Sequence, residues 1–199
     1  SLSAFGSITT ADGTTFGFSL DFSMSRSFSF TSSTQEFSLR AANLKDPLVL
    51  NFSGTSAQLR ENATVNFDLD NDGTLDEFSF VGPGSGFLAI DMHNDGSVKD
   101  GSQLFGTTSG NGFTDLAKYD QDTNGWIDEN DDIFARLMIW SMNEEGELTT
   151  RSLKEANVGA IYLGNIDSQY SLKGNDNATL GQIRNTGVFL TEDGRAKTI

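Results

Sequence analysis

One short pattern of acidic residues followed by glycine recurs along the chain, and it restricts the fold more than any other feature. In the clearest copy, residues 120–131, side-chain oxygens occupy the first, third, fifth, ninth and twelfth places, and Gly125 occupies the sixth. A loop with this spacing can surround Ca²⁺ with oxygen ligands, and the glycine permits the sharp turn that the loop requires. The predicted calcium ligands are Asp120, Asp122, Asn124, Trp126 (through its carbonyl), Asp128 and Asp131.

The residues on either side of this loop have helical spacing. Apolar residues recur at helical intervals over 113–119 before the loop and over 132–140 after it. Ile127, at the eighth place, is expected to anchor the loop to a core. The sequence thus predicts a helix–calcium loop–helix insert in the middle of the chain. The alternative is a solvated acidic turn that holds no ion.

A second copy of the pattern spans residues 68–76, and its flanks alternate between apolar and polar residues as strands do. Gly73 again takes the sixth place, but the twelfth place is Ser79, which cannot supply the bidentate carboxylate that usually closes such a site. We predict weaker calcium binding here; the alternative is a polar hairpin turn. The predicted ligands are Asp68, Asp70, Asp72, Thr74 and Asp76.

Two further segments, 91–102 and 141–147, resemble degenerate copies of the pattern. In the first, His93 and Lys99 occupy ligand places, and an ammonium group repels a divalent cation. In the second, Gly146 remains but the regular series of carboxylates is lost. We expect the first to be empty or a poor site and the second to hold no ion, although the sequence leaves both questions open.

The charge balance narrows the class of partner. The chain has 199 residues and a net charge of -15, which argues against a nucleic-acid partner. Much of the negative charge lies in the two loops, where carboxylates repel one another without a cation, so we expect Ca²⁺ to stabilise the fold. There is no cysteine, no apolar run long enough for membrane insertion and no recognisable signal peptide. Calcium is the partner and cofactor that the sequence predicts, and no protein partner is identified.

Outside the loops, alternating apolar and polar residues predict β structure. In the amino-terminal part, a turn is expected at 11–13, and the expected core positions are Phe16, Phe18, Leu20, Phe22, Met24, Phe28, Phe30, Phe37 and Leu39. Further strands are expected around 161–163, 170–172 and 188–190, and a short helix at 152–157. We predict an α+β fold, β-rich with long antiparallel hairpins, in which regions 1–52, 53–165 and 166–199 form one compact unit.

Between residues 46 and 163 the motifs follow one another in a familiar order. They are the glycine-rich segment 82–91, the segments 100–106 and 112–116, the loop 120–131 and the apolar run 134–140. With them the chain resembles bacterial RTX-associated, VCBS-repeat and EF-hand-like calcium-binding proteins, and it is similar to the self-processing module of iron-regulated Frp-type RTX proteins. That resemblance implies calcium-triggered cleavage of an Asp-Pro bond at the start of the module. The matching pair here is Asp46-Pro47.

The residues by themselves favour a calcium-binding structural module of a bacterial protein, extracellular or at the cell surface rather than cytoplasmic. Ordinary catalysis has little support, because His93 is the only histidine. In the relatives that the chain resembles, an acidic calcium loop follows the Asp-Pro pair, whereas residues 51–55 here carry no carboxylate, and this departure favours an inert bond. The alternatives are a calcium-dependent autoprocessing module, with Asp46 and Pro47 as its catalytic pair, and an adhesin-type structural segment.

Overall fold

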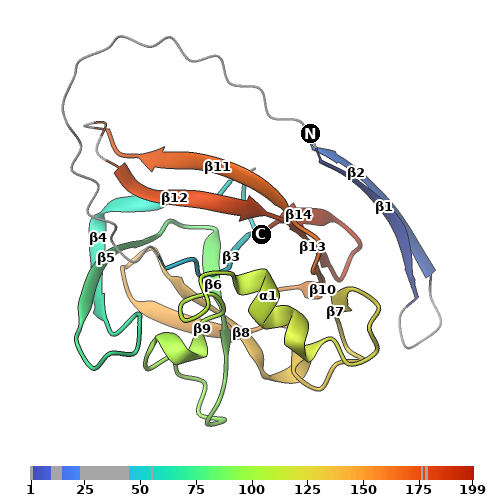
Figure 1. The fold of residues 1–199 in the computed structure, drawn as a ribbon, viewed down its shortest axis with the longest axis horizontal. Coiled ribbons are helices and arrows are strands. Elements are labelled where there is room, and N and C mark those ends of the chain that lie inside the picture. The colour runs from blue at the N-terminus through green and yellow to red at the C-terminus, as the bar shows by residue number, and fades with distance from the viewer. Residues whose placement is uncertain (1, 10–14, 23–44, 55, 176, 178) are drawn as a thin grey trace. The chain divides into compact units, whose positions relative to one another are not determined.

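The computed structural model describes residues 2–9, 15–22, 45–54, 56–175, 177 and 179–199, and it divides the chain into two compact units, Ser1–Leu44 and Lys45–Ile199 (Figure 1). In the first unit, β1 (Leu2–Thr9) pairs antiparallel with β2 (Thr15–Phe22). The strand expected around Phe18 is therefore confirmed, while the burial of its aromatic side chains stays a prediction. The turn at 11–13 and the positions Met24, Phe28, Phe30, Phe37 and Leu39 lie outside the described residues.

Strands make up most of the regular secondary structure of the second unit. Its strands are β3 (Val49–Asn51), β4 (Leu59–Phe67), β5 (Asp76–Val81), β6 (Ser85–Ile90), β7 (Trp126–Ile127), β8 (Leu137–Met142), β9 (Leu148–Ser152), β10 (Val158–Tyr162), β11 (Ile166–Lys173), β12 (Thr179–Thr186), β13 (Val188–Thr191) and β14 (Ala196–Thr198). Its helical elements are α1 (Gly112–Leu116) and the 3-10 turns η1 (Gly101–Gln103), η2 (Ala117–Tyr119) and η3 (Phe134–Arg136).

A four-stranded antiparallel sheet in the order β3-β6-β8-β9 forms the centre of this unit. All six residues of β6 are buried, as are five of the six in β8. Because successive side chains of a strand point to opposite faces, a strand buried at every position has both faces covered. Leu88 and Ile139 belong to the cluster on one face, and Phe87 and Trp140 belong to the cluster on the other.

Different elements cover the two faces. The second four-stranded sheet, in the order β14-β13-β10-β7, supplies Ile161 and Phe189 to the first cluster, and α1 adds Phe113. The β4–β5 hairpin supplies Phe67 and Phe80 to the second cluster. The remaining pair, β11 and β12, forms a long hairpin (Figure 1). Its side chains are half-buried or exposed.

The predicted α+β class with a central helix–calcium loop–helix insert is wrong. Helical turns do enter the loop, as α1 followed by η2, but the exit segment is the short turn η3 followed by strand β8. The run Leu137-Met138-Ile139-Trp140 is apolar at every position, which gives a helix no polar face for solvent but suits a central strand covered on both sides. The helix expected at 152–157 is likewise a series of turns. Among the described residues, α1 is the only α-helix, and no helix is long and apolar enough to cross a membrane.

Candidate metal centres and the bond between Asp46 and Pro47

Three loops of the second unit share one backbone geometry. In each, the first aspartate accepts hydrogen bonds from the backbone N–H groups at the fifth and sixth places. The first aspartates are Asp68, Asp91 and Asp120, and the sixth residues are Gly73, Gly96 and Gly125, with φ of 87°, 67° and 82°. Residues with a Cβ rarely adopt such φ values, so the glycine spacing of the sequence specifies the turn of each loop.

The loop 120–131 brings three carboxylates together. Asp120, Asp122 and Asp131 each place one oxygen so that all three oxygens lie within 4.8 Å of one another. Asp131 is 2% exposed, and its two oxygens accept hydrogen bonds from the backbone N–H groups of Gln121 (2.7 Å) and Asp128 (3.1 Å). The twelfth-place carboxylate therefore closes the loop onto its own beginning.

The other predicted ligands of this loop lie in the same hydrogen-bonded network. Asn124 Nδ2 donates to Asp122 at 3.0 Å and to Asp128 at 3.3 Å, and Asn124 Oδ1 accepts from the N–H of Trp126 at 2.7 Å. The fold also anchors the loop. Trp126 and Ile127 form β7, which pairs with β10, and Ile127 is 0% exposed. The side chain at the eighth place thus fixes the loop to the core, as the sequence predicted.

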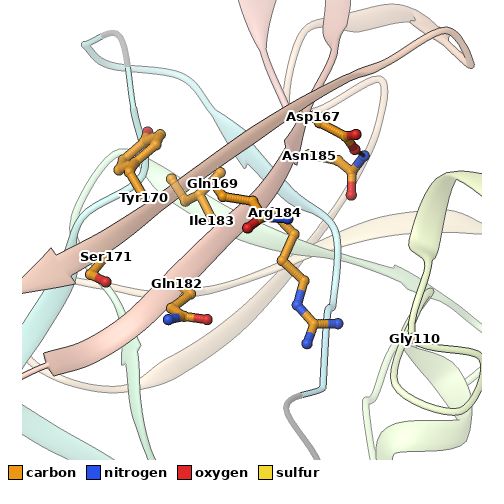
Figure 2. Close-up of a pocket in the computed structure, with 9 residues that line it drawn as sticks. All are labelled: Gly110, Asp167, Gln169, Tyr170, Ser171, Gln182, Ile183, Arg184 and Asn185. Atoms are coloured by element: carbon orange, nitrogen blue, oxygen red, sulfur yellow. Dashed lines mark hydrogen bonds between the residues drawn. The ribbon is translucent and has the colours of Figure 1, made fainter.

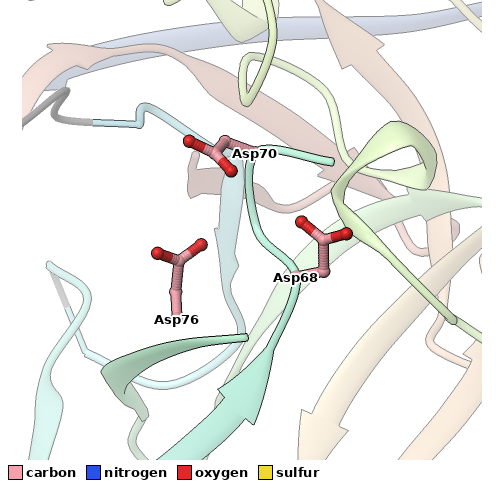
Figure 3. A group of neighbouring side chains, drawn as sticks. All are labelled: Asp68, Asp70 and Asp76. Carbon is pink, nitrogen blue, oxygen red and sulfur yellow. The ribbon is translucent and has the colours of Figure 1, made fainter. Parts of the chain in front are cut away.

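The loop 68–76 contains the second carboxylate cluster. Oxygens of Asp68, Asp70 and Asp76 lie within 4.8 Å of one another, and Figure 3 shows these carboxylates turned toward a shared space. The Oδ1 atom of Asp70 is buried and has no hydrogen-bond partner. The eighth-place side chain differs from that of the other loop, because Leu75 is 69% exposed. This loop therefore has the carboxylates of a cation site without an apolar anchor.

The side chains of two predicted ligands of this loop, Asp72 and Thr74, contact each other. Asp72 Oδ1 accepts hydrogen bonds from the backbone N–H of Thr74 at 2.7 Å and from its hydroxyl at 2.5 Å. These hydrogen bonds lower the pKa of Asp72, and the charge of Lys45 adds to the effect. The geometry thus joins Asp68, Asp70 and Asp76 and leaves Asp72 beside them.

The loop 91–102 has the shared backbone but carries its own cation. Lys99 Nζ lies 2.5 Å from Asp95 Oδ2. Gln103 is 2% exposed and closes the loop: its Oε1 accepts from the N–H of Lys99 at 2.7 Å, and its Nε2 donates to the carbonyls of Ile90 (3.2 Å) and Ser97 (2.9 Å). Gln103 stands one place beyond the twelfth, but like Asp131 in the loop 120–131 it accepts from the N–H at the ninth place, here with a neutral side chain. The segment 141–147 is a hairpin turn between β8 and β9, in which the N–H of Glu147 donates to Asn143 Oδ1 at 2.8 Å.

The segment 101–119 joins the two carboxylate loops. At its start, the N–H of Gly101 donates to the carbonyl of Asp68 at 2.7 Å, and a Cβ on Gly101 would lie 1.8 Å from the carbonyl oxygen of Leu69. At its end, α1 and η2 lead directly into Asp120. An ion that orders the loop 68–76 would therefore fix the start of this segment, and an ion that orders the loop 120–131 would fix its end.

The backbone around Asp46 rests against the middle of the same segment. The N–H of Leu48 donates to the carbonyl of Phe105 at 3.1 Å. A Cβ on Gly106, whose φ is +100°, would lie 2.0 Å from the carbonyl oxygen of Asp46. Only glycine permits this contact. The N–H of Gly106 in turn donates to Asp115 Oδ2 at 3.1 Å, so the carbonyl of Asp46 packs against a fixed stretch of backbone.

The side chain of Asp46 lies in a half-buried environment near a positive charge. Burial raises the pKa of the Asp46 carboxyl group, and the charge of Arg184 opposes that rise. Arg184 belongs to β12 and lines an open cavity of about 490 Å³ together with Gly110, Tyr170 and Gln182. Figure 2 shows its side chain extending from β12 toward the loop that carries Gly110. The β11–β12 hairpin thus brings a cation to the beginning of the second unit.

Sequence reasoning missed four residues that the structure brings to these sites. Gln103 closes the third loop, Gly106 packs against Asp46, Arg184 acts on its carboxyl group, and Lys45 lies 3.5 Å from Asp70. Gln103 and Gly106 stand in the segment 100–106 that carried the resemblance, and Lys45 directly precedes the Asp-Pro pair, but the sequence did not indicate their contacts. Arg184 belongs to none of the motifs, and it acts on a residue far away in the sequence.

A family model described as the SPM domain matches residues 48–199, beginning directly after Pro47. The chain is also similar to the iron-regulated protein FrpA of Neisseria meningitidis serogroup C, with 28% identity over 166 residues. That similarity covers 75% of this chain and 14% of FrpA, so the chain spans a small part of that relative's length. The predicted similarity to Frp-type proteins is confirmed to this extent, and the resemblance to VCBS-repeat and EF-hand-like proteins stays a prediction.

Proposed function

This chain belongs to the SPM domain family, and we propose that it is a self-processing module that binds Ca²⁺ and then cleaves its own Asp46–Pro47 bond. The observation that carries the proposal is the close contact between the Asp46 carbonyl and Gly106, in a segment whose two ends join the two carboxylate loops. The resemblance to the self-processing module of Frp-type proteins supports the same reaction.

The chemistry needs no group from outside Asp46 and Pro47 except water. An oxygen of the Asp46 side chain attacks the carbonyl carbon of Asp46, which forms a C–O bond and closes a cyclic anhydride. The bond between that carbon and the nitrogen of Pro47 breaks, and the carboxyl proton moves to the departing nitrogen. Water then opens the anhydride. Because the reacting groups belong to one residue, catalysis consists mainly of holding them in the reactive geometry.

The surroundings of Asp46 suit this reaction. The nitrogen of Pro47 is part of a tertiary amide and carries no N–H, so the strand pairing that follows loses no hydrogen bond at this residue. Burial raises the pKa of the Asp46 carboxyl group and so favours the protonated form, whose proton can move to the departing nitrogen of Pro47. The charge of Arg184 opposes that rise in pKa.

The segment after the bond also bears on the choice between a self-processing and a passive module. Its lack of carboxylates favoured an inert bond, because no ion would order a loop there. In the structure β3 lies directly after the bond and pairs with β6; its Leu50 is 0% exposed, and Asn51 accepts a hydrogen bond from the Ser85 hydroxyl at 2.6 Å. The N–H groups of Phe52 and Ser53 then donate to the carbonyl of Gly84 at 2.8 and 3.2 Å. These contacts hold the chain after the bond through protein groups alone, which supports the self-processing alternative.

The decisive experiment is mass spectrometry of the purified chain after incubation with a chelator or with Ca²⁺ at about 1 mM. We expect fragments 1–46 and 47–199 with calcium and the intact 21.5 kDa chain with chelator. Asp46→Asn removes the attacking oxygen and should abolish cleavage. Asp193→Asn, the same change in the turn between β13 and β14, should cleave like the wild type. An intact wild-type chain in calcium would contradict the proposal and leave a passive calcium module.

A second variant tests the contact at the carbonyl. Gly106→Ala places a methyl group against the Asp46 carbonyl and should slow cleavage strongly, because the reacting groups are displaced. Gly110→Ala is the matched control, since Gly110 also has positive φ but no atom lies within 4 Å of the added Cβ. Melting temperatures of both variants separate lost cleavage from lost folding. If both variants cleave equally well, the Gly106 contact plays no part in the reaction.

A further inference from the structure

The residue before the Asp46–Pro47 pair contacts one of the carboxylate loops directly. Lys45 Nζ lies 3.5 Å from Asp70 Oδ2, and the side chains are 21% and 24% exposed. Asp70 is one of the three carboxylates that share a cluster in the loop 68–76, and its other oxygen is buried without a hydrogen-bond partner. An ammonium group therefore neutralises a carboxylate that the cluster would offer to a cation.

The loop 91–102 contains the same arrangement in an internal form. There Lys99, four residues after Asp95, places its ammonium group on the Asp95 carboxylate. The loop 120–131 differs, because none of the ion pairs found in the described part of the chain involves it. Of the two loops with clustered carboxylates, only the loop 68–76 thus has a lysine as its counter-ion, and that lysine is the neighbour of Asp46.

We propose that Lys45 couples cation binding in the loop 68–76 to the reaction at Asp46–Pro47, because its ammonium group occupies Asp70 in the ion-free chain and Ca²⁺ displaces it. This inference rests on the proposed function, since it assigns a regulator to the same bond. A divalent ion interacts about twice as strongly as an ammonium group with the same carboxylates at equal distance, so it wins the competition when it is present.

The geometry explains why release at Lys45 changes the reaction. On the carbonyl side, Asp46 packs against Gly106, and beyond Pro47 the N–H of Leu48 is bonded to Phe105. On the amino side, the ion pair between Lys45 and Asp70 restrains the chain. A cation bound to Asp70 breaks this last contact. Asp46 then gains freedom at its amino side while its carbonyl stays in place, which lets the side chain turn toward its own carbonyl carbon.

The test compares Lys45→Met with Lys99→Met, which removes an ion-paired lysine from a loop that does not adjoin the bond. Cleavage is followed by mass spectrometry across a calcium titration. We expect Lys45→Met to lower the half-saturating calcium concentration about two- to five-fold, the range expected for a partly exposed ion pair, with the rate at saturating calcium unchanged. Lys99→Met should keep the wild-type midpoint. An unchanged midpoint in Lys45→Met, or an equal shift in both variants, overturns the proposal.

A binding measurement separates this inference from the proposed function. Calorimetric calcium titrations of Asp46→Asn and of the double variant Asp46→Asn/Lys45→Met use chains that cannot cleave. We expect tighter binding by the double variant, by the same about two- to five-fold. If the wild type fails to cleave but the double variant binds more tightly, the proposed function fails and the competition at Asp70 stands. If the double variant binds no more tightly, or neither chain binds calcium, the competition is refuted.

Discussion

The loops 120–131 and 68–76 have almost the same local geometry but opposite relations to the rest of the fold. Both begin with an aspartate that accepts from the fifth and sixth N–H groups, and both gather three carboxylates. The first is fixed by β7 and by the buried Ile127, and it closes on the buried Asp131. The second connects the two strands of a hairpin and leaves Leu75 exposed, and its Asp70 forms an ion pair with Lys45. A shared motif thus specifies the shape of a loop but not its stability or its response to an ion.

This difference assigns separate roles to the two loops within the proposed function. The anchored loop has its carboxylates already held by backbone N–H groups, so an ion that binds there needs little rearrangement. The loop 68–76 has a competing lysine and an unpartnered carboxylate oxygen, so an ion there changes the contacts of its neighbours. We therefore expect the loop 120–131 to stabilise the module and the loop 68–76 to control cleavage.

The largest expected difference is at the eighth place of each loop. Ile127→Ala should lower the free energy of unfolding by about 2–5 kcal/mol, because it leaves a cavity beneath a side chain that is 0% exposed. Leu75→Ala should change it by less than about 0.5 kcal/mol, because that side chain is mostly in solvent. Denaturant unfolding in chelator measures both values. Equal losses would mean that the two loops are anchored alike.

The twelfth-place carboxylate should give a smaller contrast. Asp131→Ala leaves the N–H groups of Gln121 and of the buried Asp128 without their acceptor and should cost about 1–3 kcal/mol in the absence of calcium. Asp76→Ala removes one exposed hydrogen bond, to the N–H of Leu69, and relieves repulsion within its cluster, so a change within about 0.5 kcal/mol is expected. Both variants must be measured in chelator, because in calcium each would also lose stability that the bound ion contributes. A more stable Asp131→Ala chain would refute the structural role of this carboxylate.

Terbium luminescence separates ion binding in the two loops. Trp126 lies inside the loop 120–131, so Tb³⁺ bound there should emit when tryptophan is excited. Asp120→Ala should weaken the affinity measured in this way at least about tenfold, which corresponds to about 1.4 kcal/mol. Asp68→Ala should leave the affinity measured through Trp126 unchanged. Any emission sensitised by Trp140, whose ring lies 4.7 Å from that of Phe67 next to the loop 68–76, should be lost in Asp68→Ala instead. Emission that persists in Asp120→Ala with wild-type affinity would place the ion elsewhere.

The smallest expected effect concerns Asp46, the residue that the loop 68–76 reaches through Lys45. Burial raises its pKa above the ordinary value of 3.8, so the folded chain holds this proton more tightly than the unfolded chain. That contribution to stability is present below pH 3.8 and is lost as the pH rises through the folded pKa. Asp46→Asn should therefore melt slightly above the wild type at pH 7, in chelator, and the difference should vanish as the pH falls below 3.8. A wild type that melts higher at pH 7 would contradict this sign.

Much of the second unit was predictable from local pattern. Alternation around Val65 and Phe78 predicted the β4–β5 hairpin, and the apolar positions near Ile161 and Phe189 predicted β10 and β13. The exit helix failed for a physical reason. Periodicity cannot distinguish a short, fully apolar run in a helix from one in a central strand, and only the partners β6 and β9 settled β8 as a strand.

The sequence by itself determined the loops, because their geometry depends on local requirements: glycine where φ is positive, and aspartate where backbone N–H groups need an acceptor. It also determined the pair Asp46-Pro47, a dipeptide visible without a fold. Only the tertiary structure decided what surrounds that pair. Gly106, Arg184 and Asp70 act on residues 45 and 46 through contacts between distant segments, and no local pattern encodes such contacts. The reason is that a turn is specified by the conformational preferences of a few neighbouring residues, whereas a contact between distant residues depends on the packing of the whole core.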